Sequence, residues 1–159
     1  MPVSAGFTLI ELMASIAIVA ILLAVGVPAL RDMIVAQNVR GAANDLYSDL
    51  IFARSEAIKR NAQVNVDQAT GGWVNGWSVE VGGNALRTQQ GLSNVSYTGA
   101  AATTVVYSSD GRTTLGGTTS FNFSSSSGGP ISMRCVVITA SGRPAVLVDS
   151  NRNGNCQDG

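Results

Sequence analysis

The hydrophobic pattern begins with a long apolar stretch. From Phe7 to Leu30 nearly every residue is apolar, and Glu11 is the only charged one. At about 1.5 Å of rise per residue, a helix over this stretch can cross a hydrocarbon core of roughly 30 Å. A secretory signal peptide is not indicated, because MPVSAG carries no basic residue and the apolar run is too long. The pattern predicts a membrane-spanning helix over residues 7–30.

The helical pattern continues after Arg31 as an amphipathic stretch. Apolar residues recur every three or four positions, which places them on one stripe of a helix: Val39, Ala43, Leu46, Leu50, Ala53 and Ala57. Charged residues occupy the other faces: Arg40, Asp45, Asp49, Glu56 and Arg60. Glu56 and Arg60 stand at the favourable i, i+4 spacing. We expect the helix to continue over residues 31–61 and to pack through its apolar stripe.

Residues 62–159 carry the pattern of antiparallel strands. Short β-branched or aromatic runs alternate with Gly, Asn, Ser and Asp. The expected strands are Gln63–Val66, Trp77–Val81, Val95–Thr98, Thr104–Tyr107, Ser120–Phe123, Met133–Thr139 and Ala145–Val148. SSDGRTT and TASGRPA indicate turns, and Ser124–Gly129 a mobile loop. Because a sheet with one apolar face needs a cover, we predict an α+β fold with the helix packed on an antiparallel β-sheet domain.

The composition argues against several classes of function. The 159 residues include 10 basic and 10 acidic side chains and no His, so the whole chain exerts no strong pull on nucleic acid. The lack of His removes the commonest general base and metal ligand, and the sequence offers no base beside a nucleophile. We therefore expect no catalytic residue, no cofactor and no enzyme activity.

Two features stand near the C-terminal end. Cys135 and Cys156 are too far apart for a zinc motif, and a single pair in an anchored domain favours a disulfide over free thiols. Asp149, Asn151 and Asn153 match the opening of a calcium loop, but the closing Glu is absent. The alternative is a turn rich in Asn, Asp and Gly that the disulfide pins.

Several stretches resemble a known family. GFTLIELM resembles the class III signal of type IV pilins and pseudopilins. DLYSDLIFARSEAIKRNAQVNV, GWVNGWSVEV, SSDGRTT and VVITASGRPAV resemble the GspH/FimT family of minor pilins and type II secretion pseudopilins, over essentially the whole chain. The resemblance implies that residues 1–6 are a leader, that a prepilin peptidase cuts between Gly6 and Phe7, and that Phe7 is methylated.

The resemblance also gives Glu11 a role. A charge at membrane depth is costly, and residues 7–30 contain no basic partner for it. In pilin-like filaments the acid at this position meets the new α-amino group of a neighbouring subunit, which offsets the cost of the carboxylate. The alternative is a protonated Glu11 that lipid tolerates.

The implied function is structural. The protein would wait in the inner membrane with its globular domain in the periplasm, until an assembly platform extracts it into a type IV pilus. There it would be a minor pilin at or near the tip, among other pilins. The alternative is a minor pseudopilin of a type II secretion system, in a periplasmic pseudopilus.

A binding module is the second class of function. FimT-like minor pilins are associated with DNA uptake through a Gly-Arg-x-Arg turn, and the matching stretch here is Gly142-Arg143-Pro144-Ala145, which has only the first Arg. The candidate DNA-contacting residues are Arg112, Arg134, Arg143 and Arg152. The alternative is that these arginines simply keep the surface soluble.

Overall fold

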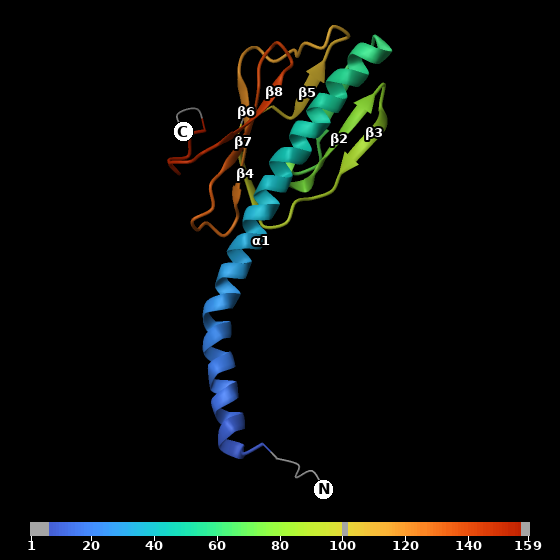
Figure 1. Cartoon of the computed structure of the whole chain (residues 1–159). Coiled ribbons are helices and arrows are strands. Elements are labelled where there is room, and N and C mark those ends of the chain that lie inside the picture. Colours follow the sequence, from blue (N-terminus) through green and yellow to red (C-terminus); the bar gives the residue numbers. More distant parts are fainter. Residues whose placement is uncertain (1–6, 100–101, 157–159) are drawn as a thin grey trace. The chain divides into compact units, whose positions relative to one another are not determined.

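The computed structural model describes residues 7–99 and 102–156. Figure 1 shows a long helix, α1 (Leu9–Arg60), followed by short strands. The strands are β1 (Val64–Gln68), β2 (Trp77–Val81), β3 (Asn84–Gln89), β4 (Val95–Gly99), β5 (Thr104–Tyr107), β6 (Thr119–Ser125), β7 (Arg134–Ile138) and β8 (Pro144–Val148), with a 3-10 turn, η1 (Trp73–Asn75), before β2. The chain forms two compact units, Met1–Ile34 and Val35–Gly159.

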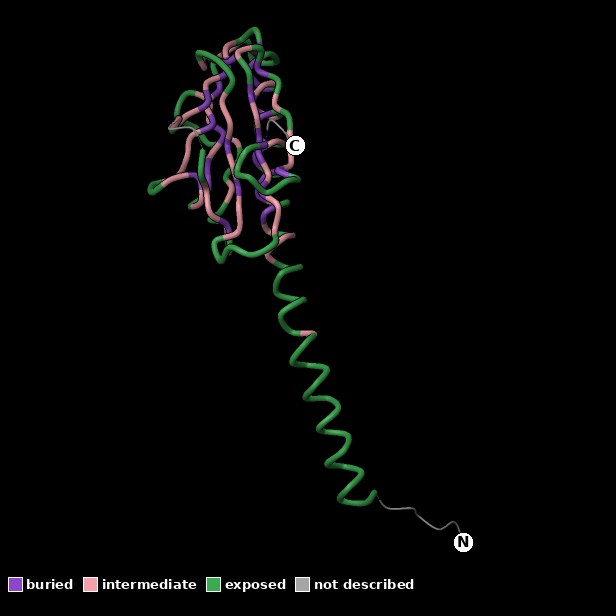
Figure 2. The backbone as a smooth tube through the Cα atoms, turned by 90° about the vertical axis from the view of Figure 1, so that its left-hand side faces the viewer, coloured by how far each residue is buried: buried purple, intermediate pink, exposed green. Residues whose placement is uncertain are grey.

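The first unit contains the apolar part of α1. Its large apolar side chains are exposed, from Phe7 at 79% to Ile34 at 56%, and the tube in Figure 2 is green along nearly all of this part. Within the described residues, α1 is the helix that is long and apolar enough to cross a membrane. Side chains of this kind are stable only where lipid or other apolar surface covers them.

The second unit contains the amphipathic part of α1. The six residues of the predicted stripe are all fully buried, which confirms the helical pattern. Asp49 and Glu56, which the sequence places on other faces of the helix, are buried as well, at 8% and 7% exposed. Glu56 is buried beneath its predicted partner Arg60, whose Nε lies 2.5 Å from Glu56 Oε2. This hydrogen bond to Arg60 is the main reason that the pKa of Glu56 is lowered.

The helix ends at a defined cap. Asn61 adopts a left-handed conformation with φ 49°, the amide of Asn61 donates to Ile58 O, and the amide of Ala62 donates to Ala57 O. These two bonds form a Schellman motif, which satisfies carbonyls that a helix otherwise leaves without partners. The chain therefore turns back at once, and β1 begins four residues after α1 ends.

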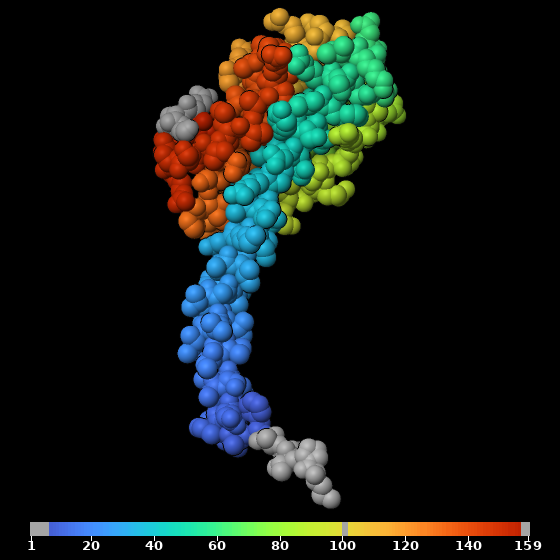
Figure 3. All heavy atoms as spheres, in the orientation of Figure 1, coloured from blue at the N-terminus to red at the C-terminus, as the bar shows by residue number. Residues whose placement is uncertain are grey.

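The strands form two sheets instead of the one that the sequence predicts. One sheet has the order β3-β2-β1-β5 and the other β4-β6-β7-β8, and all neighbouring strands are antiparallel. In Figures 1 and 3, this part of α1 lies along one side of the unit, with β2 and β3 on one flank and β7 and β8 on the other. One helix therefore covers parts of both sheets.

Two sequence predictions of strand and loop are wrong. The prediction omits β3, because its residues alternate weakly and are mostly exposed; backbone pairing with β2 holds this edge strand. Ser124–Gly129 is not wholly a loop, since Ser124 and Ser125 belong to β6 and pair with Ser96 and Val95 of β4. In both places, hydrogen bonding to a neighbouring strand overrides a weak local preference.

The core lies between α1 and the inner faces of both sheets. Alternate residues of β1, β2, β5 and β6 are buried there, as a period of two requires, and they form one cluster with the helix stripe. Trp73 and Trp77 are its largest members, and the ring centroids of Trp73 and Phe121 lie 5.0 Å apart. The Trp73 Nε1 group donates to Ala102 O at 2.9 Å, so the indole is buried with its polar atom satisfied.

Candidate functional site

Glu11 lies in the first turn of α1 and closes a capping box. The Thr8 amide and hydroxyl both donate to Glu11 Oε2 at 2.9 Å, while the Glu11 amide donates to Thr8 Oγ1 at 3.3 Å. Such a box satisfies amides that the start of a helix leaves unpaired. The T-x-x-E spacing of Thr8 and Glu11 is the sequence signal for this motif, which was not among the sequence predictions. Glu11 is thus a local capping residue in addition to its predicted role in assembly.

The predicted processing site stands just before this cap. Phe7 precedes the helix and is 79% exposed, whereas Gly6 and the rest of the predicted leader lie outside the described residues. Removal of residues before Phe7 would leave its α-amino group one residue from Thr8, which contacts Glu11 directly.

Two glycine–arginine turns meet at one end of the second unit. The turn at Gly111 and Arg112 follows β5, and the turn at Gly142 and Arg143 joins β7 to β8. They are held together by Thr113, whose amide donates to Ala140 O at 3.2 Å and whose hydroxyl donates to Thr139 O at 3.1 Å. The structure thus brings together two arginines that are far apart in the sequence.

The contact between the turns requires glycine. Gly142 has φ +75°, and a Cβ atom there would lie 2.0 Å from Gly111 O, which is an impossible approach. The Gly111 carbonyl also accepts a bond from Arg54 Nε at 3.0 Å, and the Gly142 carbonyl accepts one from the Tyr107 hydroxyl at 3.3 Å. Burial raises the pKa of Tyr107, so this hydroxyl stays a donor at physiological pH.

The other two candidate arginines lie elsewhere. Arg134 opens β7, while the Gly142 turn follows the other end of that strand. Partial burial and the charge of Arg40 lower the pKa of Arg134. Arg152 stands in the tail loop after β8, where it is exposed with φ 59°. Of the four candidate arginines, the structure brings together Arg112 and Arg143.

The C-terminal tail is tied to β7. Cys135 and Cys156 form the predicted disulfide, with Cα atoms 6.2 Å apart. The bond closes a loop of sequence separation 21, which corresponds to roughly 3 kcal/mol in the chain-entropy account. The Asp149 amide adds a hydrogen bond to Met133 O at 3.1 Å. The segment from Asp149 to Cys156 is therefore fixed to the second sheet.

The candidate calcium ligands hold the tail loop itself. Asp149 is 2% exposed, and its carboxylate accepts the amides of Asn153 and Gly154. Asn151 Oδ1 accepts the Asn153 amide, and Asn153 Oδ1 accepts the Asn155 amide. Within the described residues there is no group of three or more His, Cys, Asp or Glu that could hold a metal ion. These hydrogen bonds are typical of the alternative interpretation, a turn rich in Asn, Asp and Gly.

A buried polar group that the sequence reading missed joins α1 to the first sheet. Asp49 accepts a hydrogen bond from Trp77 Nε1 at 2.9 Å and an ion pair from Arg87 Nη1 at 3.2 Å. The Arg87 guanidinium also stacks on Phe52, 3.7 Å from the ring centroid. This group satisfies a carboxylate that burial would otherwise penalise, and it attaches the edge strand β3 to the helix.

Two known family profiles match the chain. The family profile described as "Type II transport protein GspH" matches residues 42–142, and that of the "Prokaryotic N-terminal methylation motif" matches residues 1–27. The first match spans more than half of the chain. The chain belongs to the GspH family. No curated protein matches it.

Solved structures show the same fold as this GspH family member. The type IV minor pilin FimU of Pseudomonas aeruginosa matches in two crystal forms, at 21% and 20% sequence identity, with TM-scores of 0.62 and 0.64. The matches cover 70% and 72% of this chain and 94% and 91% of FimU. The α+β pilin fold is therefore shared.

Family and structure together define the class of this GspH family protein. The GspH family consists of structural pilin-like proteins, and the fold of this member is that of a minor pilin. The methylation motif and the apolar helix indicate membrane anchoring followed by assembly with other pilins.

Proposed function

We propose that the protein is a minor pilin that is built into a type IV pilus at or near its tip. The observation that carries this proposal is the exposed apolar surface of residues 7–34. This surface needs lipid before assembly and other apolar helices after it. The likeness of the fold to FimU supports the pilus over the alternative, a pseudopilus of type II secretion.

In this proposal each part of the chain has one task. Residues 1–6 are the leader that a prepilin peptidase removes, with methylation of the new N-terminal residue Phe7. Residues 7–30 anchor the protein in the inner membrane and later join the filament core, and residues 31–61 continue the helix. Residues 62–159 form the periplasmic domain that reaches the cell surface with the pilus. An inner-membrane assembly platform would transfer the subunit between these states.

Fractionation of cells tests the proposal. We expect the tagged full-length chain to appear in sheared pili and to disappear from them when the pilus platform is deleted. Deletion of the secretion platform should leave the chain in the pili. The opposite pattern, with a chain that depends on the secretion platform alone, would establish the pseudopilus alternative.

DNA binding is a second candidate function. It is favoured by the contact between the Gly111 and Gly142 turns, which places Arg112 and Arg143 in neighbouring exposed turns. Within the described residues neither side chain takes part in an ion pair. Their donors are thus open to phosphate oxygens. Ala145, at the position of the second Arg in the family's turn, is exposed and adds no charge.

Titration with duplex DNA tests this function. For two phosphate contacts we expect weak binding whose logarithmic affinity falls with the logarithm of salt concentration at a slope of about −2. Arg112→Ala and Arg143→Ala should each reduce the slope by about 1, whereas Arg152→Ala, at the tail, should leave it unchanged. The segment 35–159 is suitable for fluorescence anisotropy. No binding at low salt, or equal effects of all three substitutions, would contradict the role of the paired turns.

A further inference from the structure

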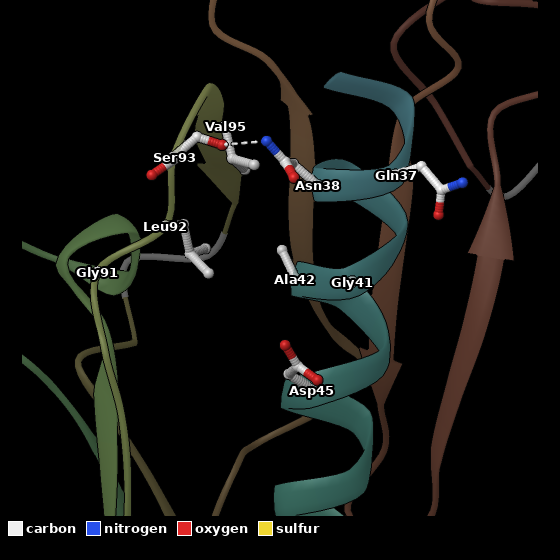
Figure 4. Close-up of a pocket in the computed structure, with 9 residues that line it drawn as sticks. All are labelled: Gln37, Asn38, Gly41, Ala42, Asp45, Gly91, Leu92, Ser93 and Val95. Carbon is white, nitrogen blue, oxygen red and sulfur yellow. Dashed lines mark hydrogen bonds between the residues drawn. The ribbon is translucent and has the colours of Figure 1, made fainter. Parts of the chain in front are cut away.

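A pocket opens between α1 and the segment that joins β3 to β4. It encloses about 290 Å³. Asn38, Ala42 and Asp45 point into it from the helix, and Leu92, Ser93 and Val95 line the opposite side (Figure 4). Gly41 on the helix side has no side chain, and a Cβ atom there would meet nothing within 4 Å. The Asn38 Nδ2 group donates to Ser93 O at 3.1 Å and bridges one end of the pocket.

Two side-chain acceptors of this pocket, the Asp45 carboxylate and Asn38 Oδ1, have no donor in the described part of the chain. Within residues 7–99 and 102–156, no side chain or amide donates to the Asp45 carboxylate, and no Lys or Arg pairs with it. The Asn38 Oδ1 atom likewise has no donor in this part of the chain, because the one hydrogen bond of this side chain uses its Nδ2 group. An arrangement of a carboxylate and an amide oxygen is suited to a positively charged donor.

The surroundings of Asp45 also favour a positively charged partner. Partial burial, and after it the neighbouring charge of Asp49, raise the pKa of Asp45. Asp49 itself already has two partners, Trp77 and Arg87. A cation brought to the pocket would therefore relieve a carboxylate that is less stable than one in free solution.

We propose that this pocket receives a Lys or Arg side chain from a neighbouring subunit of the filament, an inference that rests on the proposed function. The charged end would meet Asp45 and Asn38 Oδ1, and the aliphatic stem would lie on Ala42, Leu92 and Val95. Long basic side chains bury their stems in this way while the charge stays hydrated. The site would fix how the neighbouring subunit is seated against α1.

The size of the pocket favours a side chain over a free ligand. Pockets for drug-sized molecules enclose about 300–1,000 Å³ and bury most of the ligand. This pocket lies just below that range and is open to solvent, so it fits the end of a single side chain. A filament also supplies its subunits at a very high local concentration, which makes a weak contact effective.

Photo-crosslinking in the native pilus tests the inference. A photoreactive amino acid replaces Ser93, which is exposed at the rim of the pocket, and a second full-length variant carries it at Thr118, an exposed residue that does not line the pocket. We expect the Ser93 variant to crosslink to a pilin peptide that contains Lys or Arg. Asp45→Asn should lower the yield about two- to fivefold, in line with a partly exposed ion pair.

Matched variants separate the inference from the proposed function. Asp67→Asn removes the same charge from β1, where Asp67 accepts the Thr104 hydroxyl, and it should leave the Ser93 crosslink unchanged. Asp45→Arg should remove the crosslink, and an acidic substitution of the partner's basic residue should restore it. Normal incorporation with equal yields for Asp45→Asn and wild type would overturn the pocket alone. A crosslink to lipid, or to a peptide without a basic residue, would overturn it too. A wild-type chain that never enters filaments would overturn both proposals.

Discussion

Replacement of Glu11 by Ala should leave leader removal intact and reduce the protein in sheared filaments to a few per cent of wild type. The substitution deletes the proposed partner of the neighbouring α-amino group, and a buried unpaired charge costs several kcal/mol. It also opens the capping box with Thr8. Mass spectrometry of the mature N-terminus and immunoblots of the filament fraction measure the two steps separately.

Glu11→Gln distinguishes the two roles of this residue. Glutamine can close a capping box as glutamate does, but it carries no charge. If pairing with the amino group is essential, Glu11→Gln should fail to assemble as completely as Glu11→Ala. Near-normal incorporation of Glu11→Gln would show that capping of α1 is the whole role of the side chain.

Replacement of Trp77 by Ala should destabilise the second unit by about 3–5 kcal/mol, the range for removal of a large buried aromatic side chain. Trp77 is 1% exposed and packs 6.2 Å from Trp73 between ring centroids. Its loss would also deprive Asp49 of its donor at 2.9 Å. Urea unfolding of residues 35–159, followed by far-ultraviolet circular dichroism, gives the free energy.

Trp77→Phe is the matched control for this effect. It keeps most of the buried ring but removes the Nε1 donor, so the expected loss is about 1–3 kcal/mol, the cost of an unsatisfied buried polar group. Equal stabilities of Trp77→Phe and wild type would show that Arg87 alone satisfies Asp49. A loss of less than 1 kcal/mol for Trp77→Ala would contradict the placement of Trp77 in the core.

The helix could be read from the sequence because its signals are local. The apolar stripe repeats with helical spacing, and all six predicted positions are buried. The end of α1 differs from the predicted one by a single residue, since Asn61 is a residue type that readily adopts the left-handed cap conformation. The burial of Asp49 was not predicted, because it depends on Trp77 and Arg87, which belong to strands distant in the sequence.

The sheets were harder to predict because strand pairing is not local. Most strands alternate strongly enough to be found, whereas β3 has no clear apolar face and is held by β2. Nothing in the pattern says that β4 pairs with β6 and not with a strand nearer in sequence. The division into two sheets follows from such pairings, which depend on the packing of the whole unit.

The candidate sites also differ in whether they depend on local motifs or on contacts between distant segments. The motif around Glu11 and the Cys pair could be recognised from residue types and spacing. The meeting of the Gly111 and Gly142 turns could not, because it depends on the Thr113 bonds to the β7–β8 turn. The Asp45 pocket is likewise formed between two elements, α1 and the segment that joins β3 to β4, whose facing positions only the fold defines.

The tight contact between the two turns separates backbone geometry from surface charge. Glycine is obligatory at position 142, because any side chain would collide with Gly111 O. The exposed positions beside it, Arg112, Arg143 and Ala145, carry no comparable restraint. In a library that varies all of these sites, the glycine should be nearly invariant among folded clones while the charges drift freely. Single codon changes at these exposed positions can therefore alter the surface charge around the two turns, and the fold would tolerate each change.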